Sequence, residues 1–367
     1  MGRRIPMKFC TKCIMPETKP GIIFNKEGVC NACLYEEEAR KIDWDRRWHH
    51  LEILADGIRH KKPDGYQVIV PVSGGKDSTF ICESMRNLGL NVLAVCAEPC
   101  YPTSVGQANL DNLSRLGYDI LVFKPNQRIM PTLLKRSLIE DGQPAGAFEF
   151  LIYAVPLHEA MARKIPLVMW GEDSIQLYGN LGSGDAMEQK DFSAVGGRDA
   201  SHWITPSIVR AEDLISFQHP TKQELECAGV QADFLSHYVY WDSRRTAVYA
   251  IERGLHLRPM HDIWKTGAYW NFEQLDDEIP VISHFFKFLK FGYGRATDQA
   301  CRDIRAGHAT RAGGIQVAKA IDGTLDLEYV HRYCDYLSIS VMEFWEIAEM
   351  WMNLVLFPDG LPFGRLI

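Results

Sequence analysis

A short apolar run that leads directly into a glycine-rich turn constrains the fold of this chain more than any other feature. The run, residues 66–72, is rich in β-branched side chains and predicts a buried parallel strand. The turn consists of Ser73, Gly74, Gly75, Lys76, Asp77 and Ser78. Apolar residues then recur at helical spacing up to Gly89. A strand, a glycine turn and a helix N-terminus bind phosphate well, because backbone N–H groups and the helix dipole face the anion.

Further strand-like runs follow at residues 91–97, 119–123 and 166–170. Helical segments alternate with them near 105–116 and 151–164, and another helix is expected within 44–54. This alternation predicts an α/β fold with a doubly wound parallel sheet and right-handed crossovers. Ligands of such sheets bind beyond the carboxyl ends of the strands.

Several residues follow the predicted strands and should lie on the same rim as the glycine turn. Ala97 ends the second strand, and Gly171, Glu172 and Asp173 follow the fourth. We expect Ala97 and Gly171 to lie against a nucleotide. Glu172 and Asp173 are candidates to hold a magnesium ion or to move protons. The alternative for each acidic side chain is an ordinary helix cap.

Four cysteines near the start form two C-x2-C pairs, and these are Cys10, Cys13, Cys30 and Cys33. Each pair points two thiolates at one centre, and two pairs complete a tetrahedral zinc site in a zinc ribbon. Four sulfur ligands leave no open position, which predicts a structural metal. An iron–sulfur cluster and a redox pair are the alternatives.

The region after the predicted sheet differs in character from the part before it. Residues 178–207 are polar and glycine-rich, which favours a substrate loop over a simple connector. Helical segments dominate from Asp213 onward. Within them, residues 290–298 (KFGYGRATD) predict a compact turn that presents Arg295 to an anion, or else an exposed loop that ends a helix.

Charge and hydropathy narrow the classes of partner. The net charge is −7 and the sequence shows no cluster of Lys and Arg, which disfavours a nucleic-acid surface. No apolar stretch reaches the length of a membrane span. The start lacks the apolar run of a secretory signal, so we expect a cytoplasmic protein.

The SGGKDS turn lacks the Walker spacing and resembles the SGG-x-DS signature of the PP-loop ATP pyrophosphatases. Together with the cysteine quartet, Gly171-Glu172-Asp173, KFGYGRATD and the later Thr310-Arg311, it makes most of the chain resemble the N-acetyl sugar amidotransferases of that superfamily. These enzymes serve surface-polysaccharide and nonulosonic-acid biosynthesis. The sequence departs from the family at residues 142–149, where many members have a cysteine-containing stretch.

The resemblance implies three parts. They are a zinc-ribbon module at residues 1–40, a PP-loop ATP-binding α/β domain (adenine nucleotide alpha hydrolase-like) at 41–210, and a mainly helical substrate or partner region at 211–367. It implies ATP, Mg²⁺ and structural Zn²⁺ as cofactors, and release of AMP and pyrophosphate.

The implied reaction converts a sugar acetamido group to an acetamidino group, with ammonia from a partner glutaminase. A homo-oligomer is compatible with this interpretation. The residues to which the resemblance gives catalytic roles are Lys76, Asp77, Glu172, Asp173 and Arg295.

Two other functions remain open at this point. A PP-loop tRNA-modifying enzyme of the thiolase type would also combine such a loop with a zinc ribbon, and Cys96 and Cys100 are its local candidates for a catalytic pair. A non-catalytic assembly subunit would use the cysteine module for docking and the nucleotide as a switch.

Overall fold

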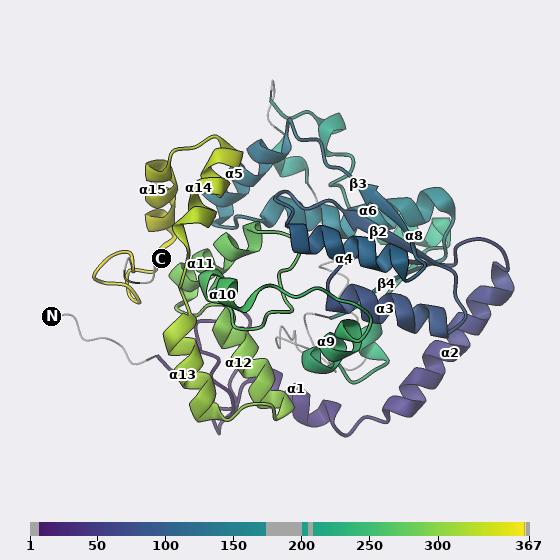
Figure 1. The fold of residues 1–367 in the computed structure, drawn as a ribbon, viewed down its shortest axis with the longest axis horizontal. Helices are drawn as coiled ribbons and strands as arrows, with labels where there is room; N and C mark the ends of the chain where they lie inside the picture. The colour runs from purple at the N-terminus through teal and green to yellow at the C-terminus, as the bar shows by residue number, and fades with distance from the viewer. Residues whose placement is uncertain (1–6, 174–199, 205–207, 363, 365–367) are drawn as a thin grey trace.

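A computed structural model describes residues 7–173, 200–204, 208–362 and 364 (Figure 1). Its centre is a sheet of five strands in the order β3-β2-β1-β4-β5, and every neighbouring pair is parallel. The strands are β1 (Val68–Pro71), β2 (Val92–Ala97), β3 (Asp119–Phe123), β4 (Leu167–Trp170) and β5 (Gln231–Phe234). The predicted α/β class with a parallel sheet is confirmed.

The strand sequences are nearly continuous apolar runs because helices cover both faces of the sheet. In β1, Ile69 belongs to one hydrophobic cluster, whereas Val68 and Val70 belong to the other. This alternation follows from the two-residue period of a strand.

Helices from different parts of the chain cover the two faces (Figure 1). The first face carries α2 (Trp44–Lys61), α3 (Lys76–Asn87) and α4 (Ser104–Arg115), whose apolar sides include Leu51, Met85 and Leu113. The second face carries α5 (Met130–Asp141) and α6 (Gly146–Arg163), followed outward by α11 (Ile279–Phe291), α14 (Leu327–Leu337) and α15 (Val341–Trp351). The C-terminal helices therefore extend the core of the sheet domain.

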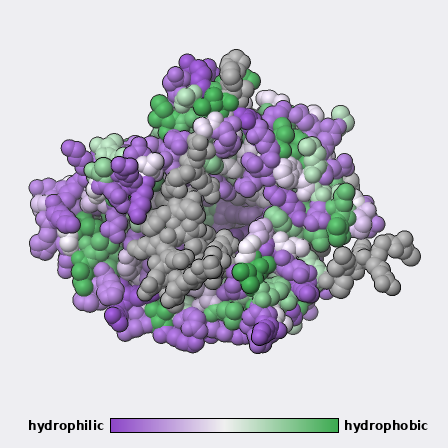
Figure 2. Space-filling model, turned by 180° about the vertical axis from the view of Figure 1, so that it is seen from behind, coloured by the Kyte–Doolittle hydropathy of each residue, from purple (hydrophilic) through white to green (hydrophobic). Residues whose placement is uncertain are grey.

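Helix α8 (Lys222–Ala228) lies beside α6 on the second face (Figure 1). The remaining helices surround the rim of the sheet and the N-terminal cysteines. They are α1 (Asn31–Ala39), α9 (Ser243–Ile251), α10 (Met260–Ile263), α12 (Arg295–Ala306) and α13 (Arg311–Ile321). None of the helices in the described ranges is long and apolar enough to cross a membrane. The face seen in Figure 2 is largely hydrophilic and carries a hollow with a hydrophilic floor near its middle.

Two sequence expectations need comment. The fifth strand, β5, was not predicted, and it carries the sheet past the domain boundary expected at residue 210. Its four residues include a buried Asp233, which breaks the apolar run that identifies a strand. The polar loop expected at 178–207 lies almost entirely outside the described residues.

A buried carboxyl joins the C-terminal region to the segment after β2. Asp277 forms an isolated bridge with Pro102, and its Oδ1 accepts the N–H groups of Tyr101 and Ile279, both at 3.2 Å. Its Oδ2 is buried and has no hydrogen-bond partner among the described residues. Burial, and then the nearby charge of Asp276, raise the pKa of Asp277 to about 7.

We expect this carboxyl to make stability depend on pH. Its pKa rises from an ordinary 3.8 in the unfolded chain to about 7 in the folded one. The folded state therefore binds the proton more tightly, and the free energy of unfolding should fall between about pH 4 and pH 7. One such group contributes a slope of at most about 1.4 kcal/mol per pH unit.

Urea unfolding of Asp277→Asn at pH 5 and pH 8 measures this contribution. The fall in stability between the two pH values should be smaller in the variant than in the wild type. The exposed Asp64→Asn serves as control and should keep the wild-type slope. An unchanged slope in Asp277→Asn would contradict the assignment.

Candidate nucleotide site and cysteine cluster

The glycine turn (residues 73–78) and the residues that follow β4 (171–173) meet where the direction of strand addition reverses. The chain adds β2 and β3 on one side of β1 and then returns to place β4 on the other side. Val68 and Ile69 of β1 pair with Leu167 and Val168 of β4. Ligands of doubly wound sheets bind outside the carboxyl ends of the strands at this switch point. The loop after β1 and the residues 171–173 after β4 both lie there.

The glycine turn has the backbone geometry of an anion site. Gly74 has a φ of 82°, and a Cβ at this position would lie 3.0 Å from the Cβ of Asn109, so only glycine fits without strain. The N–H of Ser73 donates to the Ser78 hydroxyl at 3.0 Å, which closes the turn. Gly75 precedes α3 and offers no side chain to cap it. The first N–H groups of α3 therefore remain available to a ligand.

Lys76 and Asp77 form an ion pair at the start of α3. Lys76 is 3% exposed, and its Nζ contacts the Asp77 carboxylate and lies 3.9 Å from Glu172 Oε1. Burial raises the pKa of Asp77, although the charge of Lys76 opposes this. The sequence-predicted residues Lys76, Asp77 and Glu172 are thus brought together. Two carboxylates beside one lysine are suited to hold a cation while the lysine faces phosphate.

Glu172 is held by contacts from residues far along the chain. It accepts the indole N–H of Trp241 at 2.7 Å and pairs with the Arg302 guanidinium. Burial alone would raise its pKa, but Arg302 and then Lys76 hold the pKa of Glu172 below its ordinary value. The carboxylate is therefore ionised at neutral pH, and the helix-cap alternative does not describe these contacts.

A second carboxylate extends the ion network to Arg295. Glu273 accepts from Arg295 Nη2 at 2.6 Å and from Gln299 Nε2 at 2.9 Å, and it lies 3.4 Å from Arg302. Although burial opposes it, the charges of Arg295 and Arg302 lower the pKa of Glu273 to about 2. Arg295 is thus paired within the protein and lies next to, rather than inside, the Lys76–Glu172 pair.

Asp173 points to a different set of partners. It is 1% exposed, its carboxylate lies 2.7 Å from Nε2 of His237, and its N–H donates to Ser236. The other ring nitrogen of His237 lies 3.7 Å from Asp233. A buried histidine is thus held between two carboxylates. The predicted roles of Asp173 in metal or proton chemistry remain predictions.

Ala97 ends β2 on the same rim as the glycine turn. The next residue, Glu98, donates its N–H to the Phe123 carbonyl at 2.8 Å, and its carboxylate pairs with Lys124 at 3.1 Å. Neither Ala97 nor Gly171 has a side chain that could contact a nucleotide specifically. Their predicted contacts would come from the backbone.

Sequence reasoning missed Glu273 and Arg302, which join the two halves of the site. One signal was available for Arg302, since it stands seven residues after Arg295 on α12. That spacing places both guanidinium groups on one face of a helix. No local pattern marks Glu273, which follows an aromatic run.

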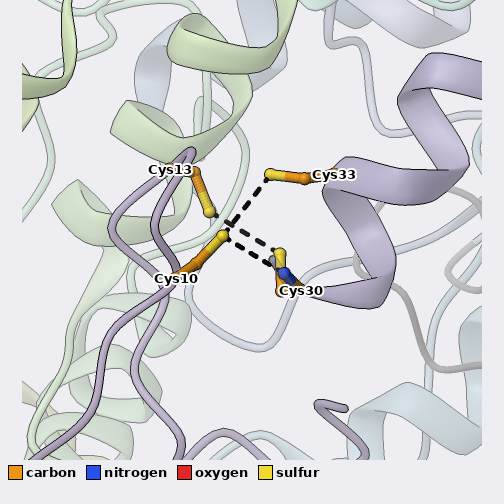
Figure 3. Close-up of side chains that lie close together, drawn as sticks. All are labelled: Cys10, Cys13, Cys30 and Cys33. Atoms are coloured by element: carbon orange, nitrogen blue, oxygen red, sulfur yellow. Dashed lines mark hydrogen bonds between the residues drawn. The ribbon is translucent and has the colours of Figure 1, made fainter. Parts of the chain in front are cut away.

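The four N-terminal cysteines form a cluster suited to a metal (Figure 3). Their sulfur atoms all lie within 4.8 Å of one another and all four residues are buried. The N–H groups of Cys30 and Met15 donate to Cys10 and Cys13, as is common around metal thiolates. The cluster could hold a metal such as zinc.

The cysteine loops dock on α12 and α13 (Figure 1). Arg311 donates to the carbonyls of Cys13 and Cys10 at 2.9 and 3.2 Å. Cys301 of α12 is fully buried in the same hydrophobic cluster as the four cysteines. The helix that carries Arg295 and Arg302 therefore packs against the cysteine cluster.

Comparison with protein families concerns this same helical region. Residues 266–360 match the family model described as LPS biosynthesis protein WbpG-like, C-terminal domain. This segment is therefore similar to the C-terminal domain of a lipopolysaccharide-biosynthesis protein. The WbpG-like segment includes Glu273, Arg295 and Arg302, so it supplies one half of the ion network. A search of curated proteins gives no match.

We expect loss of the metal to loosen α12 and α13 as well as the cysteine loops. Cys10→Ser should reduce bound metal, measured by mass spectrometry of the elements, and should speed backbone hydrogen exchange in both helices. The exposed Cys227→Ser is the matched control and should change neither. Faster exchange confined to residues 7–40 would contradict the coupling.

Removal of Arg302 should leave Glu172 and Glu273 without their shared partner. Arg302→Met is expected to lower the free energy of unfolding by about 1.5–3 kcal/mol, because it removes hydrogen bonds to charged groups while Lys76 and Arg295 still pair with the two carboxylates. Urea unfolding measures this, with the exposed Arg115→Met as control. An effect no larger than that of the control would show that the network adds little.

Proposed function

We propose that this chain is an ATP-dependent amidotransferase that converts the acetamido group of an N-acetyl sugar to an acetamidino group. The observation that carries the proposal is the ion network between two parts of the chain. Lys76, Asp77 and Glu172 come from the phosphate-loop domain, and Arg302 comes from the WbpG-like segment. A nucleotide held by the first part would thus lie beside the second.

The reaction needs an activated amide oxygen. An amide carbonyl is a poor electrophile, so ammonia does not displace its oxygen unaided. Transfer of AMP from ATP to that oxygen gives an imidate with a good leaving group and releases pyrophosphate. Ammonia then attacks the imidate carbon, AMP leaves with the oxygen, and a proton lost from nitrogen completes the amidine.

The residues of the loop fit the first step. The N–H groups at the start of α3, the hydroxyl groups of Ser73 and Ser78 and the ammonium of Lys76 would bind the β- and γ-phosphates and stabilise the departing pyrophosphate. Asp77 and Glu172 would hold Mg²⁺, which when bound neutralises phosphate charge. Binding of the triphosphate would draw Lys76 from Asp77 and leave that carboxylate to the cation.

The remaining parts of the proposal concern partners. The sequence shows no Cys-His pair typical of a glutaminase, so we propose that a glutaminase subunit supplies ammonia. We propose zinc for the cysteine cluster, on the number and type of ligands. A cytoplasmic location, where ATP is available, completes the proposal.

The test is incubation of purified protein with ATP, Mg²⁺, an ammonium salt and a panel of N-acetylated sugars, followed by mass spectrometry. We expect AMP, pyrophosphate and a sugar lighter by about one mass unit, because NH replaces O. Lys76→Ala should slow AMP formation by about a hundredfold or more, since it removes a group that stabilises the leaving pyrophosphate. The exposed Lys222→Ala is the control and should retain activity.

Other outcomes separate the alternatives. AMP without a changed sugar would contradict the sugar substrate and direct the search to tRNA. No AMP with ammonium present, and the same pathway output from Lys76→Ala in cells, would favour the non-catalytic subunit.

A further inference from the structure

An aromatic cavity of about 510 Å³ is separated from Asp77 of the glycine turn by a single side chain, Thr246. The start of α2, the middle of α3, the segment after β5 and the first turns of α9 surround it. Its aromatic lining consists of Trp44, Trp48, Phe80, Tyr238, Tyr240 and Tyr249. None of the residues named in the proposed reaction lines this cavity.

The aromatic rings do not pack tightly against one another as they would in a hydrophobic core. Phe80 and Tyr249 meet edge to face at 5.3 Å, and Trp44 and Tyr240 do so at 6.1 Å. Trp48 has no ring contact among the described residues. All of these side chains are only partly buried. Since protein interiors pack densely, a space of this size between aromatic rings is more typical of a ligand site than of a core.

Charged groups at the edge of the cavity indicate the chemistry of the ligand. Arg245 is exposed, and its guanidinium has neither an ion pair nor a hydrogen bond within the described ranges. Asp45 and Asp242 also line the cavity, but the Asp242 carboxylate already accepts the N–H groups of Arg244 and Arg245 and pairs with His308, which leaves Asp45 as the acceptor for a ligand. An unpaired guanidinium favours an anionic group, and carboxylates accept hydrogen bonds from hydroxyl groups.

The cavity reaches the phosphate loop through α9. Thr246 lines it, and the Thr246 hydroxyl lies 3.4 Å from the Asp77 carboxylate. Phe80, which meets Tyr249 of α9 edge to face, stands one turn of α3 beyond Asp77. A ligand in the cavity would therefore extend toward the place where the triphosphate is proposed to bind.

We propose that this cavity binds the acceptor substrate, an N-acetylated sugar that carries an anionic group, and this inference rests on the proposed function. The C–H face of a pyranose ring would lie on the aromatic side chains. A hydroxyl group would donate to Asp45, and Arg245 would pair with the phosphate or carboxylate of the ligand. The acetamido group would face Thr246 and the phosphate loop.

The test is direct binding of three probes to the full chain, by saturation-transfer NMR and calorimetry. UDP-N-acetylglucosamine carries phosphate, N-acetylneuraminic acid carries a carboxylate, and N-acetylglucosamine is neutral. We expect Arg245→Gln to weaken the preferred anionic probe about tenfold and the neutral sugar little, as for loss of a charged hydrogen bond. Which anionic probe binds more tightly distinguishes a nucleotide-linked sugar from a sugar acid.

Trp48→Leu tests the aromatic lining and should weaken the binding of every probe that the wild type binds. The matched control is Trp264→Leu, because Trp264 is exposed and lies outside the cavity. Binding of ATP with Mg²⁺ is measured on each variant and should not change. Arg245→Gln keeps the test informative if Trp48→Leu folds poorly, because Arg245 is exposed.

The inference is overturned if no probe binds, if neither substitution weakens binding, or if both weaken ATP instead. Its failure is separable from that of the proposed function. Sugar binding that depends on Arg245, without AMP formation, would retain the cavity and contradict the reaction. AMP formation on a sugar that both variants bind normally would retain the reaction and contradict the cavity.

Discussion

The site depends on one buried guanidinium that is shared by two carboxylates. Arg302 lies between Glu172, at the end of β4, and Glu273, which precedes α11. Burial of three charges costs free energy unless each is paired, so α12 cannot move away from the sheet without leaving charges stranded. The contact therefore sets where the WbpG-like segment lies relative to the glycine turn. Lys76 pairs with Asp77 and lies near Glu172, so the network of ion pairs continues to the glycine turn. Lys76 is therefore already paired before any ligand binds there.

The cysteine cluster fixes the same helix from another side. Cys301, next to Arg302 in sequence, is buried in the same hydrophobic cluster as the four N-terminal cysteines. Arg311 of α13 donates hydrogen bonds to the backbone carbonyls of Cys10 and Cys13. A metal bound by the four sulfur atoms would stabilise the loops that support α12. In this arrangement a structural metal would act on the candidate nucleotide site without touching it, by positioning Arg302.

Sequence patterns predicted local structure correctly where a single segment of the chain contains all the residues that form it. The strand–turn–helix around Gly74 and the two C-x2-C pairs are of this kind, because spacing alone fixes their geometry. The pairing of Glu172 and Glu273 with Arg302 could not be predicted, since it joins residues brought together only by packing. β5 was missed for a different reason. Asp233 lies in its interior, where the Tyr238 hydroxyl donates to it at 2.6 Å, so a satisfied polar group interrupts the apolar pattern.

The charged side chains of the KFGYGRATD segment (residues 290–298) are all engaged within the protein, and the expected role of Arg295 in binding an anion stays a prediction. Its lysine, Lys290, donates to the carbonyl of Asp141 at 3.0 Å and so caps the end of α5. Its arginine, Arg295, is already paired with Glu273, and its aspartate, Asp298, pairs with Lys287. Every charged side chain of the segment thus binds another part of the protein, which suits a joint between α5, α11 and α12. For Arg295 to bind an anion it would have to leave Glu273, whose other partner is Arg302. An anion at Arg295 would therefore alter the charge balance at Glu172, and the two arginines should respond to a ligand together.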